Sequence, residues 1–102
     1  MSVLVETLPR AADKLYELEL WWLENRSGAR YSVLTAFEDA IDLLSESPEI
    51  GVPYRRSSRP HLRWLRLSKT PYLMVYEYIP GSGRVLVLAV WSAEADDEPS
   101  LG

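Results

Sequence analysis

The sequence contains no cysteine and a single histidine, His61. Without cysteine the chain has neither disulfides nor thiolate metal ligands, and one histidine by itself does not make a zinc site. We therefore expect a protein that uses no metal and no cofactor.

Long apolar runs are also missing. No uninterrupted stretch approaches the roughly 20 residues of a membrane helix, and the first residues lack the basic start and apolar run of a signal peptide. We expect a cytoplasmic protein without membrane contacts. Hydrophobic residues make up 47% of the 102 positions, enough for one folded domain. We place that domain at residues 1–93, followed by an acidic, flexible tail at 94–102.

Acidic residues are absent between Val52 and Thr70, although the chain has 15 of them and a net charge of −4. The rest of the chain holds five basic residues against all fifteen acids. One sign of charge on one segment attracts phosphate or carboxylate partners, whereas the alternative is a solvated strand and loop. The six cations of this basic segment are Arg55, Arg56, Arg59, Arg63, Arg66 and Lys69.

The N-terminal half shows the pattern of a strand followed by two helices. A β-branched run at 2–6 predicts the strand, and Thr7 offers a capping oxygen ahead of Pro9, whose fixed φ suits a first helical turn. A second helix follows a break at 25–28 and ends at Ser47-Pro48, because the residue before proline resists helical geometry. Apolar residues of the first helix recur in one stripe at Ala11, Leu15, Leu18 and Trp22, with a second stripe beside it at Tyr16, Leu20 and Leu23.

The C-terminal half predicts three strands after a long connection at 52–60. They cover 61–67, 72–79 and 85–91, separated by turns rich in proline and glycine. The last run is apolar throughout, so we expect both of its faces to be covered. The element order predicts an α+β fold, with a helix hairpin packed on one face of a mostly antiparallel four-stranded sheet. The other face is left to solvent or to a partner.

Taken in order, these signals resemble the RelE/ParE superfamily of small bacterial toxins, the toxin halves of type II toxin–antitoxin pairs. The resemblance covers nearly the whole chain and implies the same β-α-α-β-β-β fold. It is carried by Pro9 with Ala12 and Leu15, by Ala36, Ala40 and Leu44 running into Ser47-Pro48-Glu49-Ile50-Gly51, by Arg63, by Tyr72-Leu73-Met74-Val75-Tyr76, and by the run from Val85 to Trp91.

The resemblance implies one of two activities. RelE-like members cut messenger RNA on the ribosome, whereas ParE-like members act on DNA gyrase and catalyse nothing. Nuclease relatives commonly carry an arginine after the aromatic residue that opens the strand at 72–79, and a His or Arg/Lys-rich segment after the last strand. Here these positions hold Leu73 and Ser92-Ala93-Glu94.

This departure favours a non-enzymatic, ParE-like inhibitor of gyrase, with growth inhibition and plasmid stabilisation as the expected consequences. One alternative is a RelE-like mRNA endoribonuclease that acts at the ribosome. Another is a degenerate, non-toxic binding module. The resemblance also implies a cognate antitoxin as partner, through which alone the toxin meets DNA.

Partner-binding residues are predicted in two places. In the basic segment they are Arg55, Arg56, Arg59 and Arg63. On the first helix they are Trp21 and Trp22, which lie about 100° apart around the axis, so that one enters the core and the other sits at a rim. For a nuclease, the candidate catalytic residues are Arg63, Tyr76 and His61, although a strand tyrosine such as Tyr76 more often belongs to the core.

Overall fold

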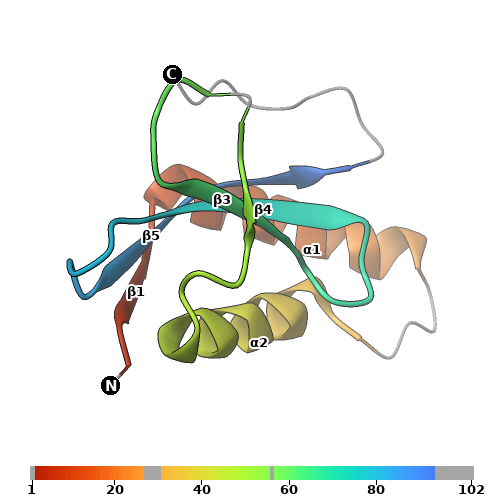
Figure 1. The fold of residues 1–102 in the computed structure, drawn as a ribbon. Coiled ribbons are helices and arrows are strands. Elements are labelled where there is room, and N and C mark those ends of the chain that lie inside the picture. The colour runs from red at the N-terminus through yellow and green to blue at the C-terminus, as the bar shows by residue number, and fades with distance from the viewer. Residues whose placement is uncertain (1, 27–30, 56, 94–102) are drawn as a thin grey trace.

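The structure, a computed structural model, describes residues 2–26, 31–55 and 57–93. They form the predicted α+β fold, in which two helices pack on a sheet (Figure 1). No helix in these ranges has the length and apolar character that crossing a bilayer requires. The proposed tail at 94–102 lies outside the described residues. The elements are β1 (Leu4–Thr7), α1 (Pro9–Asn25), α2 (Val33–Glu46), β2 (Val52–Pro53), β3 (Leu62–Arg66), β4 (Tyr72–Tyr78) and β5 (Arg84–Ser92).

The sheet has five strands in the order β1-β5-β4-β3-β2, one strand more than the sequence predicts. β1 runs parallel to β5, and every other pair is antiparallel. The additional strand is β2, whose Val52 and Pro53 pair with Trp64 and Arg63 of β3. Two residues are too few to show the alternation that identifies a strand, so the pattern assigned them to the connection.

Helix α1 begins at Pro9, but the predicted capping role of Thr7 is wrong. Thr7 is the last residue of β1, and the N-cap position falls on Leu8, which makes no side-chain capping bond. The backbone of Leu8 still donates to the Val87 carbonyl at 3.0 Å, which ties the start of α1 to β5. Proline in the first turn lacks the amide hydrogen that a cap would have to satisfy. The chain therefore enters α1 directly from the sheet.

Helix α2 is capped twice at its N-terminus. The Thr35 amide donates to the Ser32 hydroxyl at 2.9 Å, a local cap. A second cap comes from α1, where the buried Glu19 carboxylate accepts from the Val33 amide at 2.7 Å and from the Leu34 amide at 3.2 Å. The second cap fastens the two helices of the hairpin to each other.

The sheet separates two apolar clusters, and β5 contributes to both. Val85 and Val87 of β5 face the helices, where the larger core lies. On the other face Leu88 and Trp91 join Val75 in a smaller cluster. Leu88 is an extra residue in the β4–β5 register, because Val75 pairs with Ala89 and Tyr76 with Val87. The prediction that β5 is covered on both faces is confirmed.

The helix-free face of the sheet is partly covered by the chain between β2 and β3, not simply open to solvent. In Figure 1 this connection arches above the sheet while α2 lies below it. Tyr54, from the connection, meets the Trp91 ring edge-on with ring centroids 6.2 Å apart, and its amide donates to the Leu62 carbonyl. The arch therefore packs an aromatic side chain onto the second cluster and carries the start of the basic segment.

Candidate functional site

The basic segment does not form one free patch of cations. Arg59 pairs with Glu77 of β4 at 3.2 Å. Arg63 donates to the Gly51 carbonyl at 2.7 Å and to the Glu49 carbonyl at 3.0 Å. The Lys69 ammonium lies over the Tyr31 ring, 4.4 Å from its centroid. Two of the predicted binding cations, Arg59 and Arg63, and the neighbouring Lys69 thus also hold the fold together, because their partners lie far away in the sequence.

Arg55 and Arg66 are the exposed arginines of the described part of this segment. Arg56 lies outside the described residues. Directly paired residues on neighbouring strands share a face, so Arg66, opposite Leu73, lies on the helix-free face. Arg63, opposite Tyr76, lies on the helix side. Arg63 and Arg66 therefore lie on opposite faces of the sheet.

Tyr76 lies in the helix-side core with no exposed surface, as a core aromatic does. Its hydroxyl accepts a hydrogen bond from the Gly51 amide at 2.8 Å. Burial raises the pKa of this hydroxyl above its ordinary value, although the Gly51 amide and the Arg63 charge oppose that rise. The phenol is therefore neutral at physiological pH, and its oxygen is occupied by the protein's own backbone.

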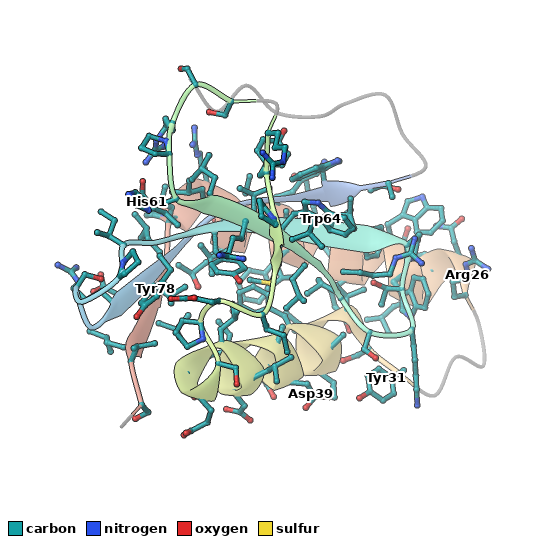
Figure 2. The ribbon with its side chains drawn as sticks, in the orientation of Figure 1. Arg26, Tyr31, Asp39, His61, Trp64 and Tyr78 are labelled. Atoms are coloured by element: carbon teal, nitrogen blue, oxygen red, sulfur yellow. The ribbon has the colours of Figure 1, made fainter. Side chains whose placement is uncertain are left out.

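His61 stands at the turn that leads into β3 and is exposed (Figure 2). Its φ of 67° lies in the left-handed region that non-glycine residues rarely adopt. The backbone carbonyl of His61 accepts from the Tyr78 amide at 3.2 Å, which extends the β3–β4 pairing by one bond. The strained turn therefore fixes where β3 begins.

The helix-free face of the sheet is mainly apolar where a phosphate-binding face would be cationic. Leu73, at the position where nuclease relatives carry arginine, is half-buried beside the small cluster. Trp64 and Leu86 also pack against this cluster, and Figure 2 shows Trp64 on the sheet near β4. Among the described residues of β3, β4 and β5 on this face, Arg66, Glu77 and Arg84 are the charged ones that flank it.

The two tryptophans of α1 divide as predicted, one in the core and one at the surface. Trp22 is buried, its indole donates to the Tyr31 carbonyl at 2.8 Å, and its ring meets Tyr72 edge-on. Trp21 is 48% exposed. Because the Trp22 ring is enclosed by α1, Tyr31 and β4, Trp21 alone of the two is presented to a partner.

The start of α2 is braced by a polar cluster that sequence reasoning did not identify. The Tyr31 hydroxyl donates to the Asp39 carboxylate at 2.5 Å, and Figure 2 shows these side chains next to each other. That hydrogen bond raises the pKa of Tyr31. Glu19 was missed as well, because a buried acid on a helix has no signature in the sequence. The only indication that Glu19 is buried is its position within an apolar stripe, directly after Leu18.

The apolar stripe of Tyr16, Leu20 and Leu23 is not in the core. These three side chains are 60%, 62% and 61% exposed, respectively. The pattern placed this stripe beside the first one, and the structure turns it outward along α1. The reason is that a single sheet face accommodates one stripe of each helix, namely the one containing Leu15 and Leu18.

Two hollows on the described surface are small and open. One, of about 170 Å³, lies between the first turns of α1 and the end of β5, where Arg10 and Lys14 line it. The other, of about 240 Å³, lies beside the Glu6–Arg84 ion pair and Glu77. Sites for small-molecule ligands typically enclose about 300–1,000 Å³. These two hollows are therefore smaller than typical small-molecule sites.

Comparisons with known proteins agree with this geometry. A family model described as the ParE toxin of the type II toxin–antitoxin system parDE matches residues 5–97. No curated protein sequence matches the chain.

Solved structures of small toxins share the fold. The free E. coli toxin RelE, carrying two arginine-to-alanine changes, superposes with a TM-score of 0.64 at 23% identity, over 95% of this chain and 90% of that one. The RelBE2 toxin–antitoxin complex of Mycobacterium tuberculosis gives 0.64 at 19% identity, over 90% and 92%. The chromosomal ParDE system of P. aeruginosa gives 0.59 at 16% identity, over 89% and 96%.

Proposed function

Because this chain belongs to the ParE toxin family, within the RelE/ParE superfamily of type II toxin–antitoxin toxins, we propose that it is a non-enzymatic inhibitor of DNA gyrase. A cognate antitoxin binds it and keeps it silent. The toxin acts in the cytoplasm without cofactor or metal, and it meets DNA only through the antitoxin. Growth inhibition, and stabilisation of a plasmid that carries the gene pair, follow from release of the toxin.

The observation that carries this proposal is the apolar character of the helix-free sheet face. Cleaving RNA by attack of the 2′-hydroxyl requires cations that stabilise the charge developing on the phosphate. At the relevant strand position the chain has Leu73, surrounded by the cluster that includes Trp64 and Trp91. An apolar surface of this kind excludes water, and at its edge the exposed Arg66, opposite Leu73, is the cation nearest to that position on the strand pair. It suits contact with another protein.

The engagement of the basic side chains points the same way. A phosphate grip needs guanidinium groups that are free to donate. Arg59 is neutralised by Glu77, and Arg63 donates to two backbone carbonyls. Tyr76, one of the candidates for moving a proton, is buried with its oxygen hydrogen-bonded to Gly51. These contacts favour a binding role over a catalytic one for this segment.

The second candidate is a RelE-like endoribonuclease, which the exposed Arg55 and the net charge of its segment favour. In that case Arg55, Arg56, Arg63 or Tyr76 would supply the essential groups. A degenerate member that binds its antitoxin and harms nothing is the third. All three candidates keep the same fold and antitoxin, so only activity separates them.

We expect induction of this chain alone in bacteria to stop growth and to change the supercoiling of a reporter plasmid. Purified toxin added to gyrase should inhibit supercoiling in vitro, without cutting added RNA. The measurements are colony counts, plasmid topoisomers on chloroquine gels and mapped transcript ends. New transcript ends inside translated codons, together with unchanged plasmid topology, would establish the endoribonuclease hypothesis. If bacteria that express the chain without antitoxin grow normally, the non-toxic binding module is the only one of the three candidates that remains.

A second prediction concerns the antitoxin. We propose that Arg55 and Arg56 contact an acidic segment of it, because Arg55 is exposed and lies in the arch over the sheet. Changing both to glutamate should weaken antitoxin binding more than tenfold, about 1.4 kcal/mol. The measurement is isothermal titration calorimetry against the antitoxin at low and high salt, since exposed charges are screened by salt.

The control for that experiment is the pair Arg26→Glu and Arg84→Glu, which changes the net charge equally but lies on other parts of the surface. We expect it to alter affinity less than the Arg55 and Arg56 pair does. Equal losses from the two pairs would mean that only overall charge matters. An unchanged affinity in low salt would remove Arg55 and Arg56 from the interface.

A further inference from the structure

Helix α1 presents three large apolar side chains to solvent. Tyr16, Leu20 and Leu23 are each at least 60% exposed. They occupy positions i, i+4 and i+7, which fall on one side of a helix. Scattered exposed leucines are ordinary, but a continuous apolar stripe on a small protein indicates a binding surface. We call these three residues the α1 stripe.

The α1 stripe lies on the exposed side of α1, beside the flank from which Glu19 caps α2. Leu23 lies one helical turn after Glu19, which reaches the Val33 and Leu34 amides at the beginning of α2. The stripe thus lies on the side of α1 that is turned away from the sheet. α1 contacts the sheet through Leu15 and Leu18. A helix laid on the stripe would rest on a surface already stiffened by the Glu19 cap.

Acidic residues follow the outer side of the stripe. Glu17 lies three residues before Leu20, Glu24 four residues after it and Asp13 seven residues before it. All three are exposed, and this spacing places them next to Leu20 along the helix surface. They form an acidic rim on the side of the stripe that is turned away from α2.

The helix layer as a whole has the opposite charge to the basic segment. Residues 9–46 contain four basic residues and eight acidic ones. α2 contributes no basic residue, and its exposed acids include Glu38, Asp42 and Glu46. A partner that lies on the helix layer therefore meets a negative field, whereas one on the basic segment meets a positive field.

We propose that the α1 stripe is the docking site of an amphipathic helix of the antitoxin, with lysine or arginine along one flank of that helix. Its apolar side covers Tyr16, Leu20 and Leu23, and its basic flank pairs with Asp13, Glu17 and Glu24. Helix-on-helix recognition through anchors at this spacing is a recurrent mode of binding. The inference rests on the proposed function in naming the antitoxin as the partner.

A second copy of this chain fits the stripe poorly. A two-fold pair of antiparallel α1 helices places each acidic rim against the rim of the copy. A parallel two-fold pair turns each rim toward α2 of the copy, where Asp42 and Glu46 are exposed. Both arrangements bring like charges together, which opposes association. Charge complementarity therefore selects a basic-flanked partner.

The proposal also specifies the layout of the antitoxin. A single partner that covers both surfaces must carry a basic-flanked helix for the α1 stripe and an acidic segment for Arg55. Reversing these charges in one partner would set like against like on both surfaces. The two charge requirements are independent, so each can be tested with its own variants.

The first test replaces the apolar anchors. Leu20→Glu and Leu23→Glu are expected to weaken binding of the antitoxin by about thirtyfold or more each, as central anchors do. Leu43→Glu is the matched control, because Leu43 is 41% exposed on α2 and outside the stripe. Calorimetry with the antitoxin measures affinity, and melting curves check the fold, which glutamate at these exposed helical positions should preserve.

The second test reverses the rim. Glu17→Lys with Glu24→Lys should weaken antitoxin binding about tenfold at low salt, with a smaller loss at high salt. Asp42→Lys with Glu46→Lys makes the same change of charge on α2 and should weaken binding less. A defined probe complements this test: two synthetic helices with identical leucine stripes, one flanked by lysine and the other by glutamate. The lysine-flanked peptide should bind at least tenfold more tightly.

Several outcomes would overturn the proposal. Unchanged antitoxin affinity in Leu20→Glu and Leu23→Glu would remove the stripe from the interface, and equal binding of both peptides would remove the charge requirement. Dimers of the free chain that Leu20→Glu dissociates would assign the stripe to a second copy. Loss of toxicity with antitoxin binding retained would assign it to the cellular target. The result that supports the proposal is a Leu20→Glu toxin that still stops growth but is no longer neutralised by the antitoxin.

This last readout separates the inference from the proposed function. If the unaltered chain fails to inhibit gyrase yet the antitoxin still binds and Leu20→Glu weakens that binding, only the proposed target fails. If gyrase is inhibited but Leu20→Glu leaves the antitoxin affinity unchanged, only the docking site fails.

Discussion

Replacing Gly51 with alanine is expected to destabilise the protein by about 3 kcal/mol. A Cβ atom at this position would stand 2.5 Å from the Tyr76 hydroxyl oxygen and 2.8 Å from both the Trp64 carbonyl oxygen and a Tyr76 ring carbon. Neither neighbour can give way cheaply, because the Tyr76 ring is fully buried and Trp64 is paired within the sheet. Chemical denaturation monitored by tryptophan fluorescence measures the change.

Glycine at another site provides the control. Gly81 has a φ of 83° and open space around it. Asparagine tolerates this conformation better than other side chains, so Gly81→Asn should cost well under the loss at Gly51. A Gly51→Ala protein as stable as the unaltered one would show that the close approach of Gly51 to Tyr76 is not a constraint.

A double substitution tests the physical cause. Tyr76→Phe removes the hydroxyl that Gly51 approaches, and by itself leaves the Gly51 amide without its partner. In the Gly51→Ala and Tyr76→Phe double variant the oxygen contact is gone, while the contacts with the ring carbon and the Trp64 carbonyl remain. We therefore expect the double variant to lose less stability than the sum of the two single losses. Simple additivity would locate the strain at the two remaining contacts, the Trp64 carbonyl and the Tyr76 ring carbon.

Gly51 also matters for the basic segment, because it is where Arg63 and β2 meet. Arg63 donates to the Gly51 carbonyl, and β2 starts one residue later. Displacing Gly51 should therefore loosen the arch that carries Arg55. The Gly51→Ala variant is expected to bind the antitoxin more weakly than its residual folded fraction alone would predict.

Replacing Glu19 with alanine is expected to cost about 2–3 kcal/mol. The carboxylate is 8% exposed and accepts from the Val33 and Leu34 amides. Removing it leaves two amides at the α2 N-terminus without this partner, and the positive end of the α2 dipole without its negative charge. The Ser32 cap remains, so α2 should still form.

Two further variants identify the source of that loss. Glu19→Gln keeps an oxygen acceptor without the charge and should lose less than alanine does. Glu17→Ala changes an exposed acid on the same helix and should shift stability by no more than about 0.5 kcal/mol. Urea unfolding of the three proteins provides the comparison. A loss for Glu19→Ala no larger than that for Glu17→Ala would mean that the carboxylate contributes nothing to the hairpin.

Much of the fold could be predicted because its signals are local. The spacing of Ala11, Leu15, Leu18 and Trp22 identifies the buried side of α1, and Ser47-Pro48 marks the end of α2. The apolar run of β5 predicted its interior position. β2 and the cap of α1 could not be predicted in this way, since two residues show no period and the role of Thr7 depended on where β1 ended.

The candidate site was less accessible to sequence reasoning. The contrast in net charge between residues 52–70 and the helix layer can be read from the sequence, and it persists in the folded protein. The contacts that the individual basic side chains make could not be predicted from the sequence. In the structure Arg59 forms an ion pair with Glu77, and Arg63 donates to the carbonyls of Glu49 and Gly51. The Lys69 ammonium lies over the Tyr31 ring. Each partner lies in another part of the chain, at least 12 residues away, and no local pattern encodes that pairing.

Periodicity and composition by themselves determined the layered architecture, the sign of charge on each part of the chain and the absence of thiol chemistry. Only the tertiary structure decided which apolar stripe of α1 is buried, which tryptophan faces solvent and which acid enters the core to cap α2. The physical reason is that a helix with two apolar stripes can bury only one against a single sheet. The choice between them depends on strands that the chain supplies some fifty residues later, about half its length of 102.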